Sequence, residues 1–271
     1  MKLIPQTMFD VFALALPRGH GFGDRPPIGA GGDGAGRVCG SGTQKMEDCS
    51  LGIIAMRRRD DHVWTVTGEE IGFASLEDAK ARLELLLRIG APSEPLPPNT
   101  APRPPLHDLK GRTPGDQFSV LLRSTHHLAA WVLNQLYLAL PNPDRNWAGD
   151  CQTRNFHTRM WEAQLLAAFR EQGLLVSQPV DSPDFHIQNP LGGEAWVEAV
   201  TANPEVPFEH VNAPRSAPPT ERDALFFGPA AVRFAKTLGS KLQRGYDRVP
   251  HVTGKPFMLA GADFHAPAAV L

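Results

Sequence analysis

In the second half of the chain, segments with the apolar spacing of a helix are followed by segments with the apolar spacing of a strand. Apolar residues recur at intervals of three and four in its long segments, and apolar and polar residues alternate in its short ones. The pattern predicts, in chain order, helices over 116–140 and 153–172, strands over 174–180, 184–188 and 194–200, a helix over 221–247 and a strand over 256–264. This order indicates a mixed α/β domain over residues 116–271.

The first 115 residues carry a weaker pattern. Residues 1–50 are a glycine-rich N-terminal region, and we expect disorder over 17–45, where large apolar residues are almost absent. Residues 51–90 predict a small ββα unit, with strands over 62–67 and 71–74 joined by a turn at Gly68. Its helix, over 76–89, begins after Ser75, a capping residue. Residues 91–115 contain eight prolines and are expected to form a semi-rigid linker.

The composition of the chain bears on its binding partners and on the compartment in which it folds. The formal net charge of -2 means that no overall positive potential attracts the chain to nucleic acid or to an anionic membrane. The most apolar segment after the N-terminal region, 128–140, is too short to span a bilayer, so we expect no membrane partner. Cys39, Cys49 and Cys151 are sparse and odd in number, which is typical of a reducing compartment. These features predict a cytoplasmic location.

Three carboxylates stand where the predicted elements could bring them together. Strand alternation places Asp184 and His186 on one face of their strand, and the short turn that follows brings Glu198 alongside. Glu162 borders the apolar stripe of the preceding helix. Three carboxylates at one place form an oxygen site suited to Mg²⁺ or Mn²⁺. The alternative is that they are solvated separately and never meet.

The same residues resemble a known family. Pro183-Asp184 opens one strand, Glu198 lies in the next within VEAVTANP, and the preceding helix reads WEAQLLAAFREQG. Over about 153–264 the chain resembles the PD-(D/E)XK nuclease superfamily, and within it bacterial members that carry these motifs. The resemblance implies a restriction-endonuclease-like αβββαβ core, preceded here by the small ββα unit and the Pro-rich linker. Since that fold usually continues with a helix after the last strand, the resemblance also raises the expectation of a truncated C-terminus.

The resemblance implies roles for individual residues. Asp184 and Glu198 would bind Mg²⁺, and Glu162 would help to hold it, in an enzyme that hydrolyses DNA. The family motif places a lysine two residues after the glutamate, where this chain has Val200. Some members supply the amine from the following helix.

Two lysines of the following helix are candidates for that amine. Lys241 lies about 60° from Leu238, at the edge of the apolar stripe, whereas Lys236 lies about 160° from Phe234 and faces away from it. We therefore expect Lys241 to be the catalytic amine; a surface lysine is the alternative. Three further residues are possible accessory groups at the metal or the attacking water: His186, Thr201 and Asn203.

These expectations lead to two main hypotheses. The first is a Mg²⁺-dependent (or Mn²⁺-dependent) nuclease acting on DNA, with basic residues of the 221–247 helix touching the phosphate backbone. The second is a catalytically inactive nuclease fold kept as a binding or interaction protein, which the missing strand lysine and the near-neutral charge would also suit. A third alternative is an α+β domain of unrelated role, in which the resemblance is coincidental.

Overall fold

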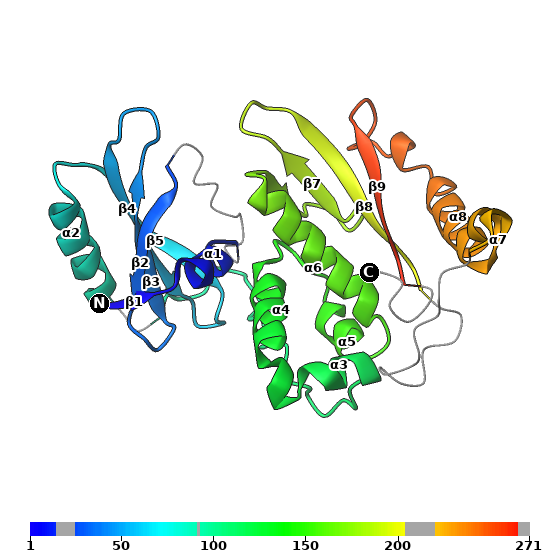
Figure 1. The fold of residues 1–271 in the computed structure, drawn as a ribbon, viewed down its shortest axis with the longest axis horizontal. Coiled ribbons are helices and arrows are strands. Elements are labelled where there is room, and N and C mark those ends of the chain that lie inside the picture. The colour runs from blue at the N-terminus through cyan, green and yellow to red at the C-terminus, as the bar shows by residue number, and fades with distance from the viewer. Residues whose placement is uncertain (15–24, 91–92, 204–219, 265–271) are drawn as a thin grey trace. The chain divides into compact units, whose positions relative to one another are not determined.

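The structure is a computed structural model that describes residues 1–14, 25–90, 93–203 and 220–264 (Figure 1). The described residues are of mixed α/β character and form two sheets. The chain divides into two compact units. The N-terminal unit contains residues 1–108, 134–141 and 169–175, and the C-terminal unit contains 109–133, 142–168 and 176–271. The first break, at residues 108–109, falls inside the proline-rich segment, whereas the later ones fall within the predicted second domain.

The N-terminal unit is built on an antiparallel sheet in the order β1-β2-β3-β4-β5. Its strands are β1 (Lys2–Ile4), β2 (Pro27–Gly32), β3 (Val38–Gln44), β4 (Leu51–Arg58) and β5 (Trp64–Phe73). Two helices accompany it, α1 (Gln6–Leu14) and α2 (Leu76–Arg88). Ile53, Ala55, Ala79 and Leu83 form a buried cluster between β4 and α2.

The prediction of disorder in the glycine-rich region was wrong for its described part, because β2 and β3 lie there. Glycine serves close packing at these positions. A Cβ at Gly40 would lie 2.4 Å from the carbonyl oxygen of Ile54 and 2.7 Å from a methyl of Leu83. The glycines therefore let neighbouring strands and α2 approach closely, a role that composition alone does not distinguish from disorder. Residues 17–24 of the predicted segment lie outside the described residues.

The ββα unit was predicted with the right helix and the wrong strands. Helix α2 begins after Ser75, whose hydroxyl accepts a hydrogen bond from the Asp78 amide at 3.0 Å, as expected of a cap. The predicted turn at Gly68 does not occur. β5 runs continuously past it, and the register with β4 shifts between Ala55 and Met56. A bulge therefore absorbs the irregularity that the sequence pattern indicated as a turn.

The proline-rich segment carries no helix or strand over its described residues 93–115, apart from one isolated bridge. That bridge pairs Glu94 with Arg59, and Glu94 exchanges backbone hydrogen bonds with Arg58 and Asp60. The beginning of the segment is therefore fastened to the N-terminal unit.

The second sheet has the order β6-β7-β8-β9. Its strands are β6 (Leu175–Ser177), β7 (Phe185–Gln188), β8 (Glu194–Ala202) and β9 (Phe257–Asp263). β7 and β8 form an antiparallel hairpin, whereas β8 and β9 run parallel. The remaining helices are α3 (Asp116–Leu121), α4 (His127–Ala139), α5 (Trp147–Gln152), α6 (Phe156–Glu171), α7 (Arg222–Phe227) and α8 (Pro229–Leu242).

The predicted order of helix, three strands, helix and strand is present, but two predicted helices are divided. The helix predicted over 116–140 is interrupted after α3 by a short 3₁₀ turn. The helix predicted over 221–247 is divided at Pro229, the first residue of α8. Proline has no amide hydrogen and favours the first turn of a helix, so a new helix begins there. Gly245, with φ 64°, then lies before a last 3₁₀ turn, Tyr246–Arg248.

Helices α6 and α8 cover opposite faces of the second sheet. Thr201 of β8 contacts Thr158 of α6, hydroxyl to hydroxyl at 2.7 Å. Glu198, three residues earlier and hence on the other face, contacts Lys241 of α8. Val200, where the family motif has lysine, lies on the α8 face and is fully buried. Glu198 and Val200 therefore lie on the α8 side of β8, and Thr201 lies on the α6 side.

Candidate active site

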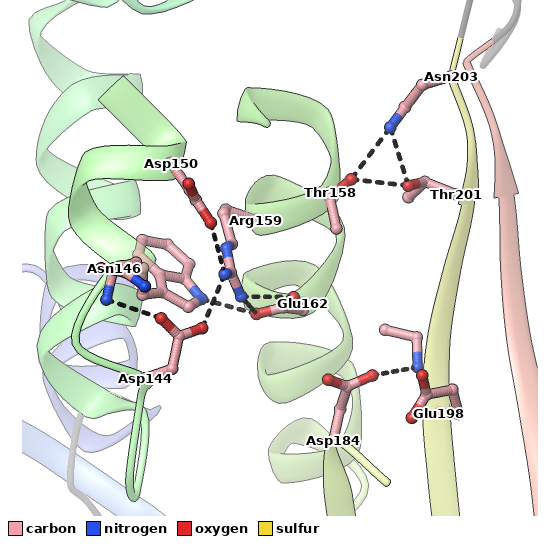
Figure 2. Close-up of polar contacts among 12 residues, drawn as sticks. Asp144, Asn146, Asp150, Thr158, Arg159, Glu162, Asp184, Glu198, Thr201 and Asn203 are labelled. Carbon is pink, nitrogen blue, oxygen red and sulfur yellow. Dashed lines mark hydrogen bonds and ion pairs between the residues drawn. The ribbon is translucent and has the colours of Figure 1, made fainter. Parts of the chain in front are cut away.

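Asp184 and Glu198 lie next to each other where β7 begins. Phe185 pairs with Val197 in the hairpin, so the register, continued by one residue, places Asp184 opposite Glu198. Asp184 Oδ2 accepts a hydrogen bond from the Ala199 amide at 2.7 Å (Figure 2). The side chain of Glu198 is 4% exposed. Asp184 thus lies beside the backbone of β8 next to Glu198, and the charge of Glu198 acts on its carboxyl group.

The two carboxylate oxygens of Glu198 differ in their hydrogen-bond partners. Oε1 accepts hydrogen bonds from the Lys241 ammonium and from the Tyr246 hydroxyl, the latter at 2.7 Å. Oε2 is buried and has no hydrogen-bond partner among the described residues. A buried carboxylate oxygen without a partner is costly unless another group satisfies it. A cation bound at Oε2 would do so.

Asp184 is held in a strongly unfavourable electrostatic environment for a negative charge. Burial, followed by the charges of Glu198 and Glu162, raises the pKa of Asp184 from 3.8 to about 7, although the Ala199 amide and Lys241 act in the opposite direction. Crowded carboxylates of this kind favour either a shared proton or a shared cation. Asp184 and Glu198 are therefore a candidate pair for sharing either a proton or a cation.

The raised pKa of Asp184 predicts a pH dependence of stability. The folded state keeps its proton up to about pH 7, whereas the unfolded chain loses it near 3.8. The contribution is complete below the lower value and is lost as pH rises through the higher one. We expect the free energy of unfolding of the metal-free protein to fall over this interval, and Asp184→Asn to flatten that fall. Denaturant titrations of both proteins at a series of pH values measure the difference, and parallel profiles would contradict it.

Glu162 belongs to a separate ion-pair network centred on Arg159. The Arg159 guanidinium lies 3.0 Å from Glu162, 2.8 Å from Asp150 and 2.7 Å from Asp144 (Figure 2). Trp147 Nε1 also donates to Glu162, at 2.7 Å. Burial raises the pKa of Glu162, and the charge of Arg159 opposes that rise. Both oxygens of Glu162 thus accept hydrogen bonds within the protein.

The three predicted metal ligands do not form one ligand set. Over the described part of the chain, no group of three or more His, Cys, Asp or Glu side chains is arranged to hold a metal ion. Asp184 and Glu198 are together, while Glu162 is occupied by Arg159 and Trp147. The expectation that Glu162 joins them was wrong, because Arg159 and Trp147 already donate to both of its oxygens.

The three accessory residues lie away from the pair. His186 Nε2 lies 2.7 Å from Glu194 Oε2, and its ring packs against Trp196 with centroids 4.6 Å apart. Thr201 bonds to Thr158 on the α6 face, and the Asn203 side-chain amide donates to both of these hydroxyls (Figure 2). The structure thus gives all three partners other than Asp184 and Glu198.

Lys241 reaches the pair and Lys236 does not. Lys241 forms an ion pair with Glu198, whereas Lys236 is exposed. This agrees with the angular positions expected on the helix. Arg244, which we expected to face a phosphate backbone, donates instead to the Tyr246 hydroxyl at 3.2 Å. Two of the cations of this segment therefore have partners within the protein.

A polar pocket of about 520 Å³ opens beside Asp184. Its walls come from the loop around 142–147, from Arg159 and Glu162 of α6, and from the segment before β7. Sequence reasoning missed this pocket and also missed Tyr246 as a hydrogen-bond partner of Glu198. The proline- and asparagine-rich PNPDRNW segment was the available signal, since such loops often line binding sites.

Comparison with known proteins returns no match among family models, curated proteins or solved structures. In the part of the chain that the structure describes, no helix combines the length and apolar character needed to cross a membrane.

Proposed function

We propose that this chain is a Mg²⁺-dependent nuclease of the restriction-endonuclease-like fold that hydrolyses DNA phosphodiester bonds. The observation that carries the proposal is the placement of Asp184, just before β7, beside β8, where Glu198 is paired with Lys241 of α8. Two acidic groups and one amine form the set that the motif requires, with the amine supplied from α8 in place of Val200. The αβββαβ order, with its antiparallel hairpin and parallel last strand, supports the same family.

The residues present fit a divalent cation. Asp184 and Glu198 would hold it, because Glu198 Oε2 is buried without a partner and the mutual repulsion of the carboxylates would be relieved. When bound, Mg²⁺ would polarise a phosphoryl oxygen, lower the pKa of an attacking water and stabilise the leaving oxygen. Lys241 would offset negative charge at the scissile phosphate and orient the water. The adjacent pocket has room for part of a nucleotide.

A second candidate is an inactive nuclease fold that binds a partner without cleaving it. The ion pair between Lys241 and Glu198 favours it, because the ammonium already neutralises the carboxylate that would bind the metal. The two candidates differ in their need for a divalent cation.

Cleavage assays on the full chain test the proposal. Plasmid, linear duplex, single-stranded DNA and RNA would each be incubated with Mg²⁺, with Mn²⁺ and with EDTA. We expect DNA cleavage with either metal and none with EDTA. A Glu198→Gln preparation purified in parallel controls for contaminating nucleases. Absence of cleavage with both metals, or equal cleavage by the variant, would reject the nuclease in favour of the binding protein.

A further inference from the structure

The hydroxyl of Tyr246 is placed against the candidate site in a manner that packing alone does not require. Tyr246 is one of two tyrosines in the chain and is 5% exposed. Its ring packs on Phe257 of β9, with centroids 5.2 Å apart. A phenylalanine would keep that contact. The hydroxyl is therefore the group whose presence needs a reason, since burying it is costly unless it is hydrogen-bonded.

The direction of the hydrogen bonds around this hydroxyl follows from its partners. Arg244 can only donate, so the hydroxyl accepts from it, at 3.2 Å. Its own proton then goes to Glu198 Oε1, at 2.7 Å. Such a bond to an ionised acceptor is among the stronger ones in proteins. Arg244 therefore donates to the Tyr246 hydroxyl, which in turn donates to one oxygen of Glu198.

The turn after α8 makes this placement possible. α8 ends at Leu242, and Gly245 adopts φ 64° and ψ 43°, a left-handed conformation that glycine accepts at little cost. The chain then reverses into the 3₁₀ turn and returns Tyr246 to the sheet. Lys241, before the turn, and Tyr246, after it, both reach Oε1. The turn thus holds this oxygen from two sides.

We infer that Tyr246 is a positioning residue for metal binding: together with Lys241 it fixes Glu198 through Oε1, so that Oε2 remains the oxygen that takes the divalent cation. The inference rests on the proposed function and adds a residue outside the family motif. Two donors on one oxygen prevent rotation of the carboxylate group, and a carboxylate whose orientation is set in advance loses less freedom when the cation binds. Without the hydroxyl, Glu198 keeps its charge but loses this orientation.

Titration of Mn²⁺ into the full chain tests this role. Tyr246→Phe keeps the ring and removes the hydroxyl, and we expect it to weaken Mn²⁺ binding by about 10–100-fold, the usual effect of losing a group that orients a ligand. Tyr137→Phe removes the other buried tyrosine hydroxyl, in the N-terminal unit, and should bind Mn²⁺ like the wild type.

A spectroscopic readout separates positioning from a general loss of structure. With tyrosine labelled by ¹³C at Cζ, the wild type gives two signals, and Tyr137→Phe leaves only that of Tyr246. Addition of Mg²⁺, which is diamagnetic, should shift the Tyr246 signal because its acceptor gains a cation, and leave the Tyr137 signal in place. This measurement decides the question even if Tyr246→Phe does not fold.

The outcomes distinguish the two proposals. If the wild type binds Mn²⁺ and a folded Tyr246→Phe binds it equally well, the positioning role is overturned and the nuclease proposal stands. If that variant does not fold, a Tyr246 signal that does not move with Mg²⁺ overturns the role in the same way. If the folded wild type binds no Mn²⁺, the proposed function fails and the positioning role fails with it. Weaker binding by a folded Tyr246→Phe supports the inference, as does a shifted Tyr246 signal where that variant does not fold.

Discussion

Replacing Lys241 with methionine should lower the rate of DNA cleavage by about a hundredfold or more, while Lys236→Met should leave it unchanged. The magnitude is that of removing a charged donor or proton-transfer group from a transition state. Lys241 contacts Glu198 from α8, whereas Lys236 lies on the same helix and is exposed. The pair of variants therefore separates a role in the site from a general contribution of positive charge to DNA binding.

The Lys241 experiment measures single-turnover cleavage rates on the DNA substrate that the wild type cleaves fastest. Unfolding curves show that each variant is folded. Lys241→Arg is the informative intermediate, since it keeps the charge and changes the geometry. Partial recovery in this variant would indicate that charge is the main contribution. Equal rates for Lys241→Met and Lys236→Met would contradict the assignment of Lys241.

Replacing Arg159 with methionine should lower the free energy of unfolding of the C-terminal unit by about 3–5 kcal/mol. Arg159 is 15% exposed and is paired with Asp144, Asp150 and Glu162. Of these, Glu162 is 6% exposed, so removal of the guanidinium leaves a buried carboxylate without its cation. Breaking one partner from a buried ion pair is costly for that reason.

A double variant supplies the control for Arg159. Adding Glu162→Gln to Arg159→Met removes the unpaired buried charge, and we expect it to recover part of the lost stability. Tryptophan fluorescence during chemical denaturation follows the right part of the molecule, since Trp131, Trp147, Trp161 and Trp196 belong to the C-terminal unit. A loss below about 1 kcal/mol, the size typical of exposed pairs, would show that the network is not important for stability.

Local patterns predicted the parts of the site that depend on periodicity. A strand repeats every two residues and a short hairpin sets its own register, so the adjacency of Asp184 and Glu198 followed from their positions. The side of α8 on which Lys241 lies followed in the same way from the rotation of 100° per residue along a helix. These inferences use a single element or one short connection between two.

The features that sequence reasoning missed depend on elements distant in the chain. Whether Glu162 turns to Asp184 or to Arg159 depends on where the loop carrying Asp144 and the helix carrying Asp150 lie. Tyr246 reaches Glu198 because Gly245 reverses the chain, and a glycine can end a helix in several directions. Glycine content likewise indicated disorder at Gly40, where the actual cause is the close approach of β4 and α2. Each of these outcomes requires the tertiary arrangement.

The central claim is that Asp184 and Glu198 share one divalent cation, and isothermal titration of Mn²⁺ into the full chain tests it most directly. The titration is performed above pH 7, where Asp184 is ionised. Asp223→Asn, which neutralises an exposed carboxylate of α7 outside the pocket, is the matched control. The account predicts one Mn²⁺ site in the wild type and in Asp223→Asn, lost in both Asp184→Asn and Glu198→Gln. Undiminished binding in those two variants, or none in the folded wild type, would contradict it.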